Sequence, residues 1–147
     1  MAALILAGGL LFRGLAAQPL AGEILTNISA QRAMDGDRIT LTLICPFQYL
    51  DQMPAERGIE LRIRVRPQPG CQAPRRRLQG RESIALPRII RDRVRRIAYE
   101  GDPDKGPAIV IDFHRPTRFF VRTYSDHREL TIRLAPSDPP THEDNQQ

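Results

Sequence analysis

Hydrophobic and polar residues alternate with a period of two along much of this chain. In residues 39–45, one face carries Ile39, Leu41, Leu43 and Cys45, and the other carries Thr40 and Thr42. This is the pattern of a β-strand with one buried face. The preceding residues 35–37, Asp-Gly-Asp, are typical of a turn, because glycine tolerates a positive φ and aspartate caps its own backbone.

The alternation is clearest in residues 59–66, which Pro67 is expected to end. One face of this predicted strand is aliphatic and the other is charged. The aliphatic positions are Ile59, Leu61, Ile63 and Val65, and the charged positions are Glu60, Arg62, Arg64 and Arg66. Because side chains on one face of a strand are about 7 Å apart, the three arginines are expected to project in a row.

Further strands are predicted in the second half of the chain. These are residues 108–113, with Pro116 as the terminator, then 118–122 and 129–134 around a polar hairpin connection. Weaker candidates are residues 23–28 and 94–99. Residues 87–97 fit both a helix and a strand, because Pro87 is suited to a first helical turn; the pattern favours a short helix or loop that passes into a strand.

Six or seven short strands between proline and glycine turns indicate an all-β fold with room for one short helix. The expected architecture is an antiparallel β-sandwich or a partly open barrel. Thirteen prolines in 147 residues argue against a helical bundle.

The N-terminus predicts export. Residues 2–12 form an uncharged apolar run, too short for a transmembrane helix of about 20 residues and typical of a signal-peptide core of about 7–15. Residues 1–17 are therefore predicted to be a signal peptide, with no membrane span after cleavage; a buried N-terminal strand or an uncleaved anchor is the alternative. Residues 18–135 would then form one domain, and the polar residues 136–147 a disordered tail.

The two cysteines agree with export to an oxidising compartment. Cys45 and Cys71 form either one disulfide, worth about 3–4 kcal/mol in the chain-entropy model, or two unpaired buried thiols. Together with three scattered histidines they show no metal-ligand spacing. The sequence predicts neither a metal site nor a cofactor.

Positive charge is concentrated in the middle of the chain. Lys and Arg total 22 against 17 Asp and Glu, and residues 57–96 hold 13 arginines against three acids. Such a stretch attracts polyanions, and guanidinium groups bind carboxylates and phosphates bidentately. The alternative is that these arginines only solvate strand faces. Nucleic acid is not expected as a partner, because no aromatic residue interrupts the basic region between Tyr49 and Tyr99.

Residues 109–121, Ile-Val-Ile-Asp-Phe-His-Arg-Pro-Thr-Arg-Phe-Phe-Val, resemble the signature of AMIN-type domains, in which a strand runs into Arg-Pro and then into a second strand. Residues 130–134, with Asp126, resemble the closing hairpin of that family, and residues 35–43 its early strand. The resemblance implies a β-sandwich in an exported bacterial protein that attaches to peptidoglycan or positions a partner in the envelope. The cysteine pair and the arginine-rich residues 75–96 depart from the family pattern.

Charge pattern and resemblance together predict a non-catalytic domain of the periplasm or cell exterior. It would bind or localise to an anionic, peptidoglycan-like envelope component. The predicted contacts are Arg62, Arg64, Arg66, Arg75, Arg76, Arg77, Arg115 and Arg118. The alternative is a structural module of an envelope, secretion or pilus assembly that docks on another protein by strand addition.

Catalytic patterns are sparse. The triad residue types of residues 125–127, Ser-Asp-His, are consecutive on a predicted turn and are unsuited to a relay. Asp112 and His114 are expected on one strand face, where the acid either orients the imidazole or forms a surface ion pair with it. Asp102 and Asp104 lie in a predicted exposed loop. The sequence therefore predicts no enzyme.

Overall fold

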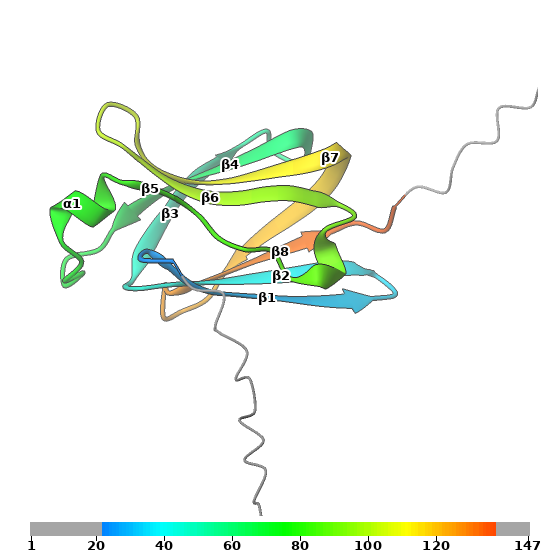
Figure 1. The fold of residues 1–147 in the computed structure, drawn as a ribbon, viewed down its shortest axis with the longest axis horizontal. Helices are drawn as coiled ribbons and strands as arrows, with labels where there is room; N and C mark the ends of the chain where they lie inside the picture. Colours follow the sequence, from blue (N-terminus) through cyan, green and yellow to red (C-terminus); the bar gives the residue numbers. More distant parts are fainter. Residues whose placement is uncertain (1–21, 138–147) are drawn as a thin grey trace, which may run out of the picture.

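Two antiparallel β-sheets pack face to face in the computed structural model, which describes residues 22–137 (Figure 1). Sheet A contains β1 (Leu25–Ala33), β2 (Gly36–Leu43), β8 (Glu129–Leu134) and the second half of β7 (Gly106–Thr123). Sheet B contains β3 (Phe47–Met53), β4 (Arg57–Pro67), the first half of β7, β6 (Val94–Asp102) and β5 (Arg81–Ser83). Two short segments, the helix α1 (Arg75–Leu78) and the 3₁₀ turn η1 (Arg88–Ile90), lie between strands.

The predicted all-β sandwich is confirmed, and the described residues form eight strands. The predicted signal peptide, residues 1–17, lies outside the described residues, as do residues 138–147 of the predicted tail. The transition expected in residues 87–97 is also confirmed, because η1 follows Pro87 and passes into β6 at Val94.

The two-residue alternation places the core between the sheets as predicted. In β2, Ile39, Leu41 and Leu43 are buried, and Thr40 and Thr42 are only half-buried. In β4, the aliphatic residues Leu61, Ile63 and Val65 are likewise buried, and Ile59 is the exception.

Ile59 was expected in the core, but its side chain is 54% exposed. The pairing of β4 with β7 shifts register between Gly58 and Glu60. Such a bulge turns the residue within it away from the face that the alternation assigns. Leu61, beyond the bulge, returns to the core.

The prediction that Pro116 ends a strand is wrong. The single strand β7 continues through it and leaves sheet B to enter sheet A, at the right of Figure 1 where the ribbon changes from yellow to orange. The pairing of β7 with β4 skips from Asp112 to Thr117. Proline is tolerated where the strand has no ladder partner for the proline nitrogen. The bend of β7 occurs in this interval, residues 113–116, which have no partner on β4.

The first half of β7 is buried on both faces, although an alternating pattern was expected there. Val110 is fully buried and Asp112 is 7% exposed. Because β7 lies between β4 and β6 in the middle of sheet B, long side chains from both neighbours stand beside these outward-facing residues. Asp112 receives a 2.7 Å hydrogen bond from Arg96 Nε, which compensates for its burial.

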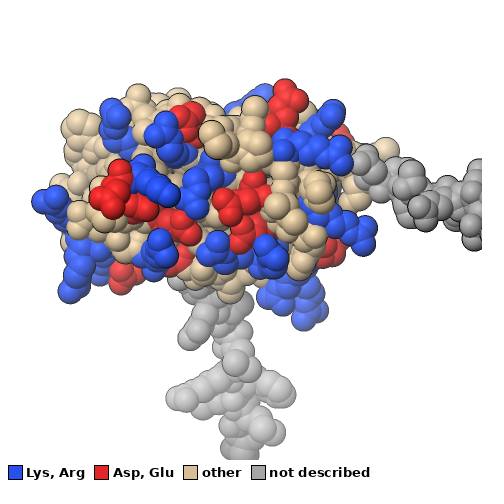
Figure 2. All heavy atoms as spheres, turned by 90° about the horizontal axis from the view of Figure 1, so that it is seen from above, with Lys and Arg blue, Asp and Glu red and all other residues tan. Residues whose placement is uncertain are grey.

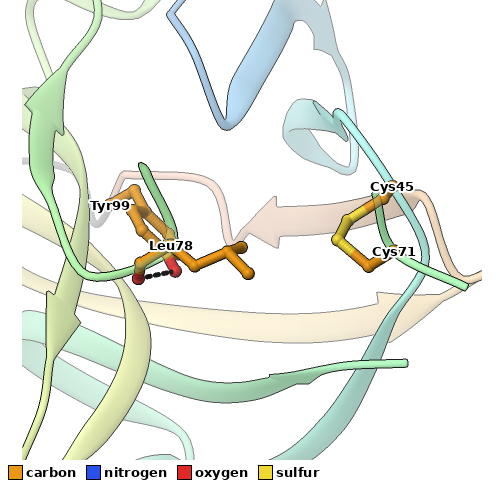
Figure 3. Close-up of a disulfide and its surroundings, with 4 residues drawn as sticks. All are labelled: Cys45, Cys71, Leu78 and Tyr99. Atoms are coloured by element: carbon orange, nitrogen blue, oxygen red, sulfur yellow. Dashed lines mark hydrogen bonds between the residues drawn. A yellow bond between two sulfur atoms is a disulfide. The ribbon is translucent and has the colours of Figure 1, made fainter. Parts of the chain in front are cut away.

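Cys45 and Cys71 form a disulfide, as one of the two sequence-based alternatives held (Figure 3). The sulfur of Cys45 belongs to the buried core, and Cys71 lies in the connection that follows β4. The bond thus ties that connection to the turn between β2 and β3, 26 residues earlier in the chain.

Replacing both cysteines, Cys45→Ala and Cys71→Ala, is expected to lower the free energy of unfolding by about 3–4 kcal/mol, because the unfolded chain regains the entropy of a 26-residue loop. Urea denaturation of the oxidised wild type and the double variant measures this difference. The reduced wild type is the control and should resemble the variant. Equal stability of all three samples would contradict the prediction.

Candidate anion-binding site

The predicted arginine row of β4 is largely engaged in ion pairs. On the outer surface of sheet B, the guanidinium of Arg62 lies 3.0 Å from Glu100 Oε2, and its Nε lies 3.7 Å from Glu60. Arg64 pairs with Asp51 of the neighbouring strand β3. Figure 2 looks onto this side of the molecule and shows acidic side chains interleaved with basic ones.

Arg96 completes this network on β6. Its Nε donates to Asp112, and its Nη1 lies 3.9 Å from Glu100. The hydrogen bond to Asp112 raises the pKa of Arg96, and the hydrogen bond from Arg64 lowers the pKa of Asp51. Arg62, Arg64 and Arg96 are therefore each neutralised by a nearby carboxylate, and these three arginines leave little net charge for a ligand.

Arg66 is the exception in the predicted row of Arg62, Arg64 and Arg66, since the described residues provide no ion pair for it. It lies near the end of the strand, one residue before Pro67. Of the predicted row, Arg66 alone keeps an uncompensated charge among the residues that the structure describes.

The arginine arm, residues 68–80 between β4 and β5, carries the second predicted cluster. Its helix α1 presents Arg75 and Arg76 as exposed side chains, and neither has an ion pair within residues 22–137. Arg77 is half-buried, with its Nε 3.5 Å from Glu23 Oε2. Two adjacent free guanidinium groups thus extend from this arm.

Two further contacts besides the disulfide fix the arm to the sandwich, and Figure 3 shows the first of them, between Tyr99 and Leu78. The buried Tyr99 on β6 donates a 2.6 Å hydrogen bond from its hydroxyl to the Leu78 carbonyl. Gly101 N donates to Gly80 O at 2.8 Å. A Cβ at Gly101 would lie 2.0 Å from the Leu78 oxygen, so only glycine lets the arm approach β6 this closely.

Glu82, beside the arm on β5, is a structural residue that the sequence analysis missed. Its carboxylate accepts hydrogen bonds from three consecutive backbone nitrogens, those of Glu23, Ile24 and Leu25, at 2.6–2.8 Å. It thereby fixes the start of β1 at the edge of β5. No local pattern marks such a contact, because the partners are 57 or more residues apart.

The hydroxyl of Tyr99 is held in its neutral form. Burial raises the pKa of Tyr99 to about 12, and the negative charge of Glu82 adds to the shift. Because the folded pKa exceeds the unfolded value of 10.0, the resulting stability is fully present below pH 10 and is lost as the pH rises towards 12.

Tyr99→Phe is expected to cost about 1 kcal/mol at neutral pH, because the Leu78 carbonyl loses its donor. The wild type should lose more stability than the variant between about pH 10 and 12. Urea denaturation of both proteins across that range measures the difference. Tyr124→Phe, at an exposed tyrosine, is the control. Parallel pH profiles for wild type and Tyr99→Phe would show that Tyr99 does not carry this dependence.

The last predicted contacts, Arg115 and Arg118, lie at the bend of β7. Both side chains are exposed, and the described chain offers neither of them an ion pair. Arg118 pairs in register with Arg57 of β4. The structure does not bring these two residues to the arm, because the bend and α1 lie at opposite ends of the sandwich (Figure 1).

The residue types singled out for chemistry do not assemble into a reactive group. Asp112 pairs with Arg96, and His114 Nε2 lies 3.1 Å from the Arg91 carbonyl, so the expected contact between Asp112 and His114 is wrong. Asp126 accepts a hydrogen bond from the backbone of its own turn.

Asp102 likewise forms hydrogen bonds within its own loop. Its carboxylate accepts hydrogen bonds from the backbone nitrogens of Asp104 and Lys105, which lower its pKa. Within residues 22–137, no group of three or more His, Cys, Asp or Glu side chains is arranged to hold a metal ion. No helix in the same part of the chain is long and apolar enough to cross a membrane.

Comparisons with protein-family models, with curated proteins and with solved structures find no match to this chain. Its functional assignment therefore rests on the geometry of its own surfaces.

Proposed function

We propose that this chain is an exported, non-catalytic domain that binds an anionic component of the bacterial cell envelope, such as peptidoglycan, in the manner its resemblance to AMIN-type domains implies. The observation that carries the proposal is the arginine arm. It offers Arg75 and Arg76 without a compensating acid in the described residues.

The rigidity of the arm supports this role. A ligand that contacts a flexible loop must bear the entropy of ordering it, whereas a preorganised surface avoids this cost. The disulfide, the Tyr99 hydroxyl and the close approach at Gly101 hold the arm before any ligand arrives. The disulfide is also typical of proteins that function in oxidising compartments.

Removing the two free charges, Arg75→Ala and Arg76→Ala, is expected to reduce retention on purified peptidoglycan sacculi at low salt by about tenfold or more, because the loss of even one charged hydrogen bond costs about 1.5 kcal/mol. Retention of the wild type should fall as salt screens the exposed charges. Co-sedimentation with sacculi measures both effects.

Arg62→Gln with Arg64→Gln is the matched control, since it removes the same charge from the ion-paired surface of sheet B. It should retain near wild-type binding. If this control loses as much retention as the arm variant, binding follows overall charge and the arm has no special role. If the wild type is not retained at low salt, the proposal is wrong.

The alternative function, docking by strand addition, has one observation in its favour. Strand β3 pairs only with β4 among the described strands, so its outer edge lacks a partner there. Binding through backbone hydrogen bonds of an edge strand depends little on arginine charge. Partner binding that is insensitive to both salt and the arm substitutions would favour this alternative.

A further inference from the structure

Two pairs of arginines face each other directly across neighbouring strands, one on sheet A and one where the start of β4 pairs with β7 beyond its bend. Arg38 of β2 is in register with Arg133 of β8, and Arg57 of β4 is in register with Arg118 of β7. Directly opposite side chains on one sheet face have Cβ atoms about 4.5–5.5 Å apart, so like charges there destabilise the sheet. In the next row Thr40 faces a second threonine and avoids this repulsion.

An exposed aromatic ring lies among these arginines. Phe120 of β7 is 46% exposed and is in register with Arg133, whose guanidinium carbon lies 4.9 Å from the ring centroid. Arg118 and Arg122, two residues before and after Phe120 on the same strand, project from the same face. We call these six residues the arginine–phenylalanine face: Arg38, Arg57, Arg118, Phe120, Arg122 and Arg133.

This face keeps a net positive charge. Asp35 lies 3.4 Å from Arg133, and Glu129 stands at the far end of β8 opposite Thr42. Five arginines against these two acids leave a net charge of +3. The other four arginines have no ion pair within residues 22–137, in contrast to Arg62, Arg64 and Arg96 on the outer surface of sheet B.

The remainder of the same sheet surface is uncharged and rich in hydrogen-bonding groups. Its exposed or half-buried members are Asn27, Ser29, Gln31, Thr40 and Thr42, whereas Thr131 beside them is buried. Hydroxyl and amide groups both donate and accept, as sugar hydroxyls require. An exposed ring offers an apolar surface to sugar C–H groups, and guanidinium forks fit carboxylates.

We infer that the arginine–phenylalanine face binds an acidic glycan, a polysaccharide whose sugars carry carboxylates. The disulfide, which is typical of oxidising compartments, favours such an extracytoplasmic polymer over nucleic acid. The bend of β7, where Arg118 lies, is at the opposite end of the sandwich from α1 (Figure 1), so the inference does not require the arginine arm to bind.

Titration of the full chain with an oligogalacturonate, followed by NMR of the backbone amides, tests the location. Amide shifts are expected along β2, β8 and the second half of β7, around Arg38, Arg133 and Phe120. Shifts confined to α1 or to sheet B, or no shifts at low salt, would overturn the inference. The sacculus experiment on the arm stands independently of this result, because it uses another ligand and other variants.

The variant Arg38→Thr with Arg57→Thr removes one member of each opposed pair. It is expected to weaken oligogalacturonate binding about tenfold or more and to raise the urea midpoint, because the cross-strand repulsion disappears. A purely structural role for these arginines predicts no loss of binding. Arg81→Thr with Arg95→Thr is the control, with the same charge change on exposed residues of β5 and β6; it should bind within about twofold of wild type.

A second ligand separates glycan recognition from charge alone. Inorganic polyphosphate of matched charge carries no sugar, and a neutral dextran carries no charge. Tighter binding of oligogalacturonate than of either polymer supports the inference. Equal or tighter binding of polyphosphate, or equal loss in both double variants, would overturn the assignment to an acidic glycan.

Discussion

The continuous strand β7 is the constraint on which the rest of this structure depends. Its 18 residues pair with β4 and β6 in one sheet and with β8 in the other. Both sheets therefore share one backbone, and the core closes between the two halves of that strand. Phe113 and Phe119, on either side of the bend, stack with ring centroids 5.8 Å apart and fill the corner where the sheets meet.

The same strand also separates two electrostatic environments. In sheet B its outward residues, Val110 and Asp112, are covered by neighbours, and the arginines above them are paired with acids. In sheet A its outward residues are Arg118, Phe120 and Arg122, which remain exposed. Among the described residues, arginines without an ion pair are therefore found beyond the bend and on the arm, whereas in the arginine row predicted on β4 only Arg66 lacks one.

The fold class followed from periodicity because half-buried strands need one hydrophobic face, as β2 and most of β4 illustrate. The alternation of hydrophobic and polar residues does not indicate which strands pair with each other or in which register. The bulge that exposes Ile59 depends on the register with β7, and Pro116 is compatible with a strand only because its nitrogen has no ladder partner at the bend. Strand β3 was missed because only Phe47, at its start, is buried, so its pattern is weak.

The candidate site was predictable only where it depends on residues that are neighbours in the sequence or alternate along one strand. Consecutive arginines on the arm are visible in the sequence, and so is a row of arginines on an amphipathic strand. Whether an arginine is free depends on acids that are distant along the chain: Glu100 is 38 residues from Arg62, and Asp51 is 13 residues from Arg64. The opposed arginine pairs cannot be predicted from the sequence either, since Arg38 and Arg133 meet only when β2 and β8 pair, and Arg57 and Arg118 only when β4 and β7 pair.

Ion-paired arginines and directly opposed arginines have opposite effects on the energy of the folded state. A compensated network such as that of Arg62, Arg64 and Arg96 lowers the energy of the folded state through each contact that it makes. Directly opposed arginines raise that energy and are relieved only when an anion lies between or above them. A surface that repels itself in the free protein therefore gains more from binding an anion than a surface whose charges are already neutralised, and this difference directs the search for a ligand to sheet A and to the arm.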